Sequence, residues 1–97
     1  MGETDDFEWD DVKDAKTRAN RDLELLAASR MFDGRPRLER ISAKSLPSEV
    51  RYEAIAEVDG RVLFCVWTWR GPRRRIVSLR VAHRSERRAY QEATQRS

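Results

Sequence analysis

Apolar and polar residues alternate most regularly in the second half of the chain, in three runs separated by two turn signals. The first two runs, residues 50–58 and 61–69, flank Asp59-Gly60, a dipeptide typical of two-residue hairpin turns because it tolerates positive φ angles. The third run covers residues 75–81 and follows the turn signal Gly71-Pro72. This pattern predicts three consecutive strands joined by tight turns.

The two-residue turn also predicts the register of the first hairpin, because side chains alternate between the two faces of a sheet. Ile55 lies opposite Phe64 in this register, and Arg51 lies opposite Thr68. Neither face is wholly polar, so we expect helices to cover part of one face and a ligand or partner to cover part of the other. One face carries Tyr52, Ala54 and Ala56 with Leu63, Cys65 and Trp67, and the other carries Arg51, Glu53, Ile55 and Glu57 with Val62, Phe64, Val66 and Thr68.

Helical spacing and capping residues precede these strands. Residues 7–9 alternate and are able to add a short strand to the sheet. Asp10 or Asp11 then caps a helix predicted over residues 11–19, whose apolar positions form one narrow face. The polar segment of residues 20–22 ends that helix.

A second helix is predicted over residues 23–32, with Asp22 as its N-cap and Gly34 in the left-handed closing position. Residues 35–41 indicate a short edge strand, because the proline within them cannot donate a hydrogen bond to a neighbouring strand. Residues 42–49 are predicted to form a loop that leads into the three-strand segment.

The last predicted element is a helix over residues 84–95, whose apolar positions are few. The resulting order is one strand, two helices, four strands and a helix. This order is typical of an α+β domain, here with an antiparallel sheet of about four strands, two N-terminal helices and a C-terminal helix. The 97 residues suffice for a single domain, which we assign to residues 7–97, and residues 1–6 form an acidic, flexible N-terminus.

Composition excludes several classes of function. No apolar run has the length of a membrane span and the acidic start is unlike a signal peptide, so we expect a cytoplasmic protein without membrane contact. The single cysteine, Cys65, lies in an apolar strand and is interpreted as a buried hydrophobe rather than a catalytic thiol. One histidine and one cysteine do not make a credible metal site, and we expect no metal or other cofactor.

Charge is divided unevenly along the chain. The first fourteen residues carry seven acidic groups and one lysine, a net charge of −6, and the remainder carries +9. From Arg70 onward there are nine arginines and no lysine, a composition suited to forked contacts with phosphate or carboxylate groups. The alternative is a solvated basic surface with no dedicated ligand. The acidic start is either a solvating tail or a segment that folds over the arginines and competes with phosphate.

Short motifs follow one another along most of the chain: Phe7-Glu-Trp-Asp10 with Lys13, Ala28 and Phe32, Arg51-Tyr52, Val58-Asp-Gly-Arg-Val62, Thr68-Trp-Arg-Gly71, Ile76-Val-Ser-Leu-Arg80 and Glu86-Arg-Arg-Ala-Tyr90. This ordered set resembles the BrnT family of type II toxins, from Phe7 to about Ala93. The resemblance implies a RelE-like fold, an RNA endonuclease that arrests translation, and a cognate BrnA-like antitoxin with a ribbon-helix-helix domain. It also implies a hetero-oligomer that reaches operator DNA only through the antitoxin.

Cleavage of RNA by its own 2′-hydroxyl requires a proton acceptor, stabilisation of the phosphorane charge and a proton donor for the leaving oxygen. A guanidinium meets the second need by gripping two phosphate oxygens, but its pKa above about 12 makes it a poor acid or base. By resemblance, Arg51, Arg61, Arg70 and Arg80 lie near RNA with Thr68. We expect catalytic roles for Arg51, Thr68, Arg70 and Arg80, and RNA binding by Arg61, Arg73, Arg74, Arg75 and Trp69.

Three residues are candidate acids or bases, namely His83, Glu86 and Tyr90, and each has a structural alternative. His83 is also able to cap the last helix, and Glu86 and Tyr90 are able to hold Arg80 or Arg87 in place. Trp69, near a strand end, is open to stacking on bases or to packing in the core.

The face that Arg80 occupies depends on the register of the second hairpin. Pairing Thr68 with Ser78 places Arg80 on the face of Arg51, whereas pairing Thr68 with Val77 places Arg80 on the opposite face. Both registers remain open.

The sequence also supports a second hypothesis, in which the chain is a binding protein and not an enzyme. Asn20-Arg21-Asp22 stands where the family usually has Lys-His-Gly, and His83 and Trp67 stand at two further departures from the family pattern. The alternative to the ribonuclease is therefore a catalytically inactive toxin-like domain that binds only RNA or a protein partner.

Overall fold

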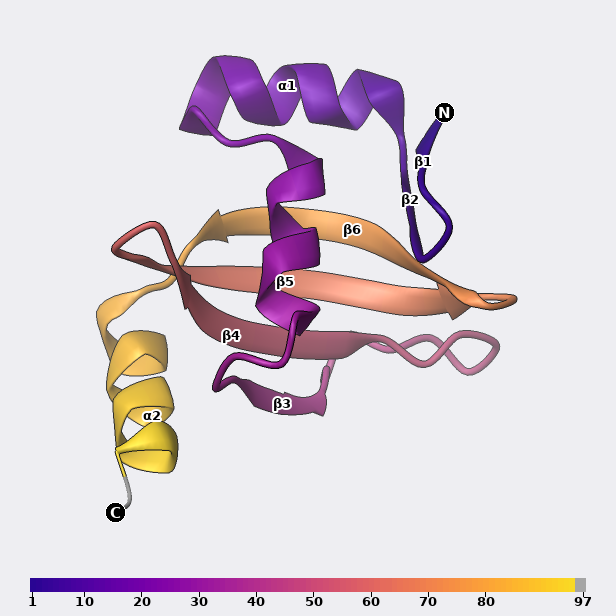
Figure 1. Cartoon of the computed structure of the whole chain (residues 1–97). Helices are drawn as coiled ribbons and strands as arrows, with labels where there is room; N and C mark the ends of the chain where they lie inside the picture. Colours follow the sequence, from indigo (N-terminus) through magenta and orange to yellow (C-terminus); the bar gives the residue numbers. More distant parts are fainter. Residues whose placement is uncertain (96–97) are drawn as a thin grey trace.

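A mixed sheet of six strands forms the centre of the computed structural model, which describes residues 1–95 (Figure 1). The order across the sheet is β1-β2-β6-β5-β4-β3, and β2 pairs with β6 in the parallel direction. The predicted α+β class is correct, but the antiparallel sheet of about four strands is not. The strands are β1 (Gly2–Glu3), β2 (Phe7–Trp9), β3 (Leu38–Ile41), β4 (Tyr52–Val58), β5 (Arg61–Arg70) and β6 (Arg73–Val81).

The first hairpin has the register that the Asp59-Gly60 turn predicts. Ile55 lies opposite Phe64, and the ladder continues to Tyr52 opposite Trp67. Asp59 and Gly60 adopt φ angles of 52° and 81°, which is the backbone conformation that such a turn requires. The two faces of the hairpin therefore carry the predicted sets of side chains.

The second hairpin contains a β-bulge that neither predicted register includes. Val66 lies opposite Ser78 and Trp67 opposite Ile76, so Val77 is an additional residue in β6. In a regular strand, two side chains five positions apart, such as those of Arg75 and Arg80, point to opposite faces. The extra residue between them places both side chains on the same face. Arg75 and Arg80 consequently share a face, and Arg80 lies opposite Phe64.

Residues 1–6, expected to precede the domain, contribute β1 to the sheet, and residues 7–9 form the short strand β2, as predicted. Gly2 lies opposite Trp9 in an antiparallel pair, and β2 lies beside residues 74–76 of β6. Glu8, on β2, forms an ion pair with Arg75 at 2.7 Å. Complementary charge therefore attaches the acidic start of the chain to the basic strand. The end of the predicted domain, residues 96–97, lies outside the described residues.

Helix α1 (Asp11–Arg21) is capped by Asp10, one of the two residues predicted for this role. The Asp10 carboxylate accepts the backbone N–H groups of Val12 and Lys13 at 2.8 and 3.0 Å. The helix runs two residues beyond the predicted end and stops at Asp22, whose φ of 54° is left-handed. The prediction that Asp22 caps the second helix is therefore wrong, because Asp22 closes the first.

The second helical segment is a 3₁₀ helix, η1 (Leu25–Phe32), and its start depends on a contact with α1. The buried carboxylate of Asp14 accepts the backbone N–H of Leu25 at 2.8 Å and pairs with Arg18 at 3.0 Å. A side chain eleven positions earlier thus supplies the acceptor that an N-cap normally provides. Gly34 adopts a φ of 98° just after η1, as predicted.

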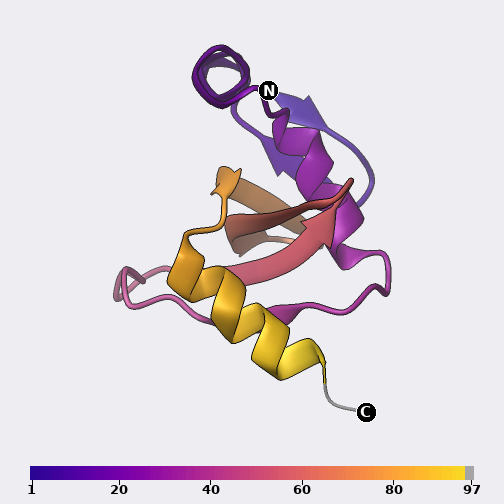
Figure 2. The same cartoon turned by 90° about the vertical axis from the view of Figure 1, so that its left-hand side faces the viewer.

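Helices cover both faces of the sheet in part. Figure 2 shows α2 (Arg84–Thr94) on the side of the sheet opposite η1, whereas α1 lies beyond the edge of β6. Leu25, Ala28 and Met31 of η1 are fully buried against the face that carries Trp67. Tyr90 of α2 packs at the edge of both apolar clusters of the core. No helix within residues 1–95 has the length and apolar character required to cross a membrane.

Replacing Asp14 by alanine is expected to lower the free energy of unfolding by about 1–3 kcal/mol, because the buried N–H of Leu25 loses its acceptor. Urea unfolding followed by circular dichroism measures this loss. Asp11→Ala is the matched control, since the Asp11 carboxylate is 62% exposed and, among residues 1–95, forms an ion pair only with the N-terminal amino group. Equal losses in the two variants would contradict the role assigned to Asp14.

Candidate functional site

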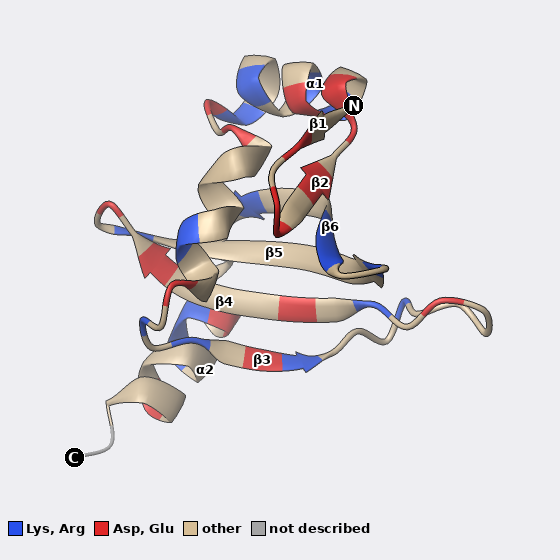
Figure 3. Cartoon of the chain, turned by 45° about the vertical axis from the view of Figure 1, so that its right-hand side comes forward, with Lys and Arg blue, Asp and Glu red and all other residues tan. Residues whose placement is uncertain are grey.

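Two adjoining hollows lie on the sheet face opposite η1 and share three lining residues, and we call the two together the basic groove. Their volumes are about 450 and 240 Å³, and both are lined by Lys13, Arg51 and Val77. Figure 3 marks basic positions on α1, β3 and β6, three elements that each contribute at least one cation to the groove. Its charged lining consists of seven cations, Lys13, Arg40, Lys44, Arg51, Arg70, Arg75 and Arg80, and four carboxylates, Asp10, Glu49, Glu53 and Glu86.

Arg80 is the most firmly positioned cation of the groove. Its two terminal nitrogens donate to the two carboxylate oxygens of Glu86 at 2.7 and 2.8 Å. The guanidinium also lies over the ring of Phe64, 4.0 Å from the centroid. The predicted contact between Glu86 and Arg80 is therefore present, and it fixes the direction of the guanidinium.

Glu86 remains ionised near neutral pH. The hydrogen bonds from Arg80, together with the backbone N–H of His83 at 2.7 Å, lower the pKa of Glu86 from 4.5 to about 2. A carboxyl group with this pKa is poorly suited to proton transfer near neutrality. The arrangement therefore favours the structural alternative for Glu86, which is to position Arg80.

The contribution of Glu86 to stability is expected to depend on pH. Because its pKa is lowered in the folded state, this contribution is present above about pH 4.5 and is lost as the pH falls toward 2. We expect Glu86→Gln to be less stable than the wild type by about 1–3 kcal/mol near pH 6, with a gap that narrows as the pH falls from 4.5 toward 2. Urea unfolding across this pH range tests the expectation. The exposed Glu92→Gln control should show no such gap.

Arg51 and Arg70 meet at the other end of the groove through a shared carboxylate. Glu49 lies 3.0 Å from Arg51 and 3.7 Å from Arg70. Thr68 lies beneath them, 3% exposed, and its hydroxyl donates to the carbonyl of Val50 at 2.8 Å. The structure thus brings the four residues expected to be catalytic into one groove, with the Thr68 hydroxyl engaged in holding two strand ends together.

Lys13 is a groove residue that the sequence reasoning did not single out as functional. Asp10 starts α1 and so places Lys13 in its first turn, where the side chain lines both halves of the groove. Partial burial, and then repulsion from Arg21 and Arg51, lower the pKa of Lys13 below its usual value. The one feature of the sequence that pointed to a functional role for Lys13 was its place in the motif that begins at Phe7.

The side chains of the three consecutive arginines of β6, Arg73, Arg74 and Arg75, lie in different surroundings. Arg75 lines the groove and is held by Glu8 at 2.7 Å. Arg73 donates to the carbonyl of Thr4 at 2.8 Å and lies 3.3 Å from Glu3. The acidic start of the chain therefore contacts Arg73 and Arg75.

Arg74 and Trp69 lie on the opposite face of the sheet from the groove. The Arg74 guanidinium lies 4.4 Å from the ring centroid of Phe32 and 4.8 Å from that of Trp69. Trp69 is 48% exposed and contacts Trp67 edge to face. Neither of these expected RNA-binding residues shares a surface with Arg80.

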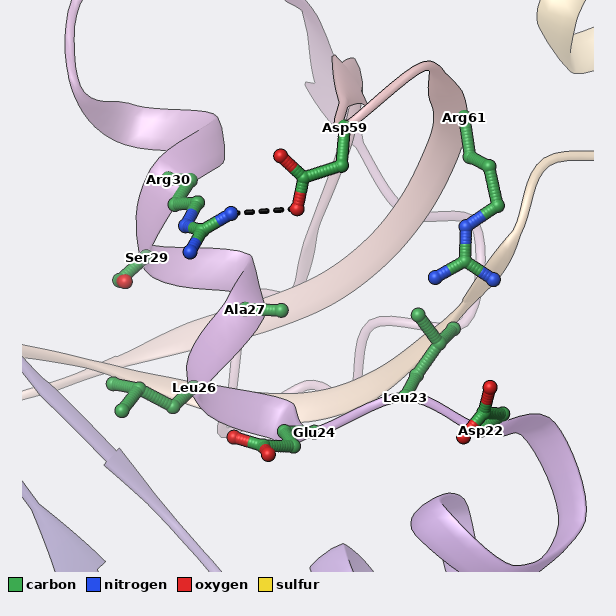
Figure 4. A pocket seen from close by; sticks show the side chains of 9 residues that line it. All are labelled: Asp22, Leu23, Glu24, Leu26, Ala27, Ser29, Arg30, Asp59 and Arg61. Carbon is green, nitrogen blue, oxygen red and sulfur yellow. Dashed lines mark hydrogen bonds and ion pairs between the residues drawn. The ribbon is translucent and has the colours of Figure 1, made fainter.

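Arg61 and His83 are also outside the basic groove. Arg61 follows the first hairpin turn and lines a separate hollow with Leu23 and Asp22 (Figure 4). The imidazole of His83 is 70% exposed and lies in a third hollow, at the start of α2. Its backbone N–H donates to Glu86, so His83 takes part in the start of the helix. The structure thus does not group these two residues with the arginines of the groove.

Cys65 is fully buried, and burial raises the pKa of its thiol well above the usual value. This agrees with its interpretation as a buried hydrophobe. Within residues 1–95, no three or more His, Cys, Asp or Glu side chains lie close enough to share a metal ion. Cationic side chains outnumber the carboxylates among the described residues that line the groove.

The fold and the groove define a class, a small α+β domain with arginine and lysine side chains gathered on one face of its sheet. Residues 9–86 match the model of a protein family described as the ribonuclease toxin BrnT of type II toxin–antitoxin systems. The match covers most of the chain and includes every cation of the groove, so the chain belongs to this family. Membership implies an antitoxin as partner. A search of curated proteins finds no match to the chain.

Proposed function

We propose that this protein is an endoribonuclease that cuts RNA in the basic groove and thereby arrests translation until its antitoxin binds. The observation that carries the proposal is the convergence of seven cationic side chains on one sheet face, from elements far apart in the sequence. Such a groove attracts the phosphate backbone of a single strand of RNA and orients it by forked contacts.

In the proposed reaction the 2′-hydroxyl of the RNA attacks the adjacent phosphate. Arg80 and Arg51 stabilise the charge that develops on the phosphorane oxygens, because a positioned guanidinium is most effective where charge appears in the transition state. Lys13 accepts the proton of the 2′-hydroxyl, a role favoured by the lowering of its pKa. Water in the open groove protonates the leaving 5′-oxygen, so no step requires a metal ion.

The remaining groove residues are assigned to binding and support. Arg70 and Arg75 lie along the same groove and are proposed to hold the phosphates that flank the cleaved one. Thr68 is proposed to keep the two strand ends in place through its bond to Val50. A substrate phosphate would replace Glu49 as the partner of Arg51 and Arg70.

The antitoxin is proposed to be a BrnA-like protein with a ribbon-helix-helix domain, encoded beside this gene. In the complex the toxin would reach operator DNA only through that domain. The support is the family resemblance together with the match over residues 9–86.

Cleavage of a defined RNA by the purified chain in excess EDTA tests the proposal. New 5′-hydroxyl ends and 2′,3′-cyclic phosphates are expected, together with growth arrest and reduced translation when the chain is expressed without its antitoxin. Intact RNA from well-folded protein, with and without added ribosomes, would refute the ribonuclease activity. Cleavage that EDTA abolishes would refute only its metal independence.

A second candidate function is binding of RNA or of a protein partner without cleavage. Three observations favour it: His83 lies outside the groove, Glu86 stays ionised, and Arg80 is already paired. In that case the purified chain should retain RNA in a filter-binding assay without producing new ends.

A further inference from the structure

The outer edge of β3 presents unpaired backbone groups. Among the described residues, β3 is the last strand of the sheet and pairs only with β4. The N–H of Ser42 donates to the carbonyl of Arg51 at 2.8 Å, which sets the alternation of hydrogen-bonded pairs along this ladder. In that alternation the backbone groups of Arg40 point toward β4, and those of Glu39 and Ile41 point outward. An added strand would bind these two residues.

Beside this edge lies an aromatic hollow of about 390 Å³, on the face opposite the basic groove. It is lined by Glu39, Arg40, Ile41, Tyr52, Trp67, Trp69 and Arg74. Ile41, on the edge strand, is 68% exposed, and Trp69, on β5 at the other side of the hollow, is 48% exposed, so two large apolar side chains are open to a partner. This combination is typical of surfaces that bind an extended peptide.

Arg74 gives the hollow a charge preference, because with Arg40 it outnumbers the one carboxylate of the lining, Glu39. Its guanidinium is stacked on the rings of Phe32, Trp67 and Trp69, and its Nε is buried without a hydrogen-bond partner. Within residues 1–95 no carboxylate lies within ion-pair distance of Arg74. An acidic side chain of a partner would complement this cation.

We infer that the β3 edge and the aromatic hollow bind an extended segment of the antitoxin, which adds a seventh strand to the sheet. The segment places apolar side chains against Ile41 and Trp69 and an acidic side chain toward Arg74. A peptide satisfies the outward backbone groups of Glu39 and Ile41, whereas the backbone of RNA lacks the matching amide donors. The inference rests on the antitoxin partnership that family membership implies, and not on catalysis.

Amide hydrogen exchange at single-residue resolution tests the inference. The probe is the protein encoded by the reading frame adjacent to this gene, purified in complex with the full chain. The amides of Glu39 and Ile41 should exchange at least about tenfold more slowly in the complex, whereas those of Leu38 and Arg40, already bonded to β4, should change little. Unchanged exchange at Glu39 and Ile41, or no binding by this protein, would overturn the inference.

Substitutions give a second measure that does not depend on cleavage. Ile41→Asp and Trp69→Ala should each weaken antitoxin binding by at least about tenfold. Val12→Asp, at an equally exposed apolar position on α1, should leave it unchanged. If Trp69→Ala weakens binding of a single-stranded oligonucleotide but not of the antitoxin, the hollow binds bases and the inference fails. A chain dimer that Ile41→Asp dissociates would overturn it in favour of a second copy.

Discussion

Replacing Arg80 by alanine is expected to lower the rate of RNA cleavage by about 100- to 1,000-fold, the usual effect of removing one positioned donor to a transition-state oxyanion. Glu86 and Phe64 hold the Arg80 guanidinium in the groove, so little reorganisation is required when phosphorane charge develops. Arg80→Lys keeps the charge but loses the fork, and should recover only part of the rate. Single-turnover cleavage of a short RNA measures both variants.

The Arg80 experiment needs a control for folding, because alanine leaves the carboxylate of Glu86 without its main partner. The double variant Arg80→Ala, Glu86→Gln removes that unpaired charge and should restore stability without restoring cleavage. Arg88→Ala, an exposed position on α2 outside the groove, is the matched charge control. Full activity in a folded Arg80→Ala variant would refute the placement of the scissile phosphate beside Arg80.

Replacing Lys13 by methionine should reduce cleavage by about 100- to 10,000-fold, the range typical of the loss of a general base. The deprotonated lysine is the active form, so the wild-type rate should rise with pH and level off above the lowered pKa of Lys13. Lys13→Arg keeps a positive charge but cannot release a proton near neutrality, and should be nearly as slow as Lys13→Met. Rates measured between about pH 6 and pH 10 provide the profile.

The comparison between the two Lys13 variants separates proton transfer from simple attraction of phosphate. If Lys13→Arg cleaves at the wild-type rate with an unchanged pH profile, Lys13 acts only through its charge. RNA affinity at low salt is the accompanying measurement, because Lys13→Met should weaken it whereas Lys13→Arg should not. Wild-type cleavage by Lys13→Arg would be compatible with the groove as the RNA site, but it would mean that a residue other than Lys13 is the general base.

Much of the fold follows from short segments whose conformation is decided locally. Asp59-Gly60 adopts the positive φ angles of a hairpin turn whatever lies around it, and the pairing of Ile55 with Phe64 follows from that turn. Asp10 accepts backbone donors two and three residues later, so the start of α1 is also a local property. These elements were predictable because their causes lie within a few residues of one another.

The candidate site was predictable only in part. Motif matching selected Arg51, Thr68, Arg70 and Arg80, which the structure brings to one groove, but it also selected Arg61, which lies elsewhere. Arg74, also expected to bind RNA, lies on the opposite face of the sheet. Arginines that are neighbours in the sequence, such as Arg74 and Arg75, alternate between the faces of a strand. A cluster of charge in the sequence is therefore divided between two surfaces of the folded chain.

The sequence by itself determined the α+β class, the first hairpin and its register, the cap of α1 and the membership of a family of ribonuclease toxins. Only the tertiary structure decided the bulge at Val77, which places Arg80 on the groove face, and the contact of Asp14 with Leu25, which replaces the expected cap of η1. The first set depends on neighbouring residues and periodic patterns. The second set depends on pairings between residues distant in the sequence. Local preferences for helix or strand do not choose among such pairings, because packing in the complete sheet decides between them.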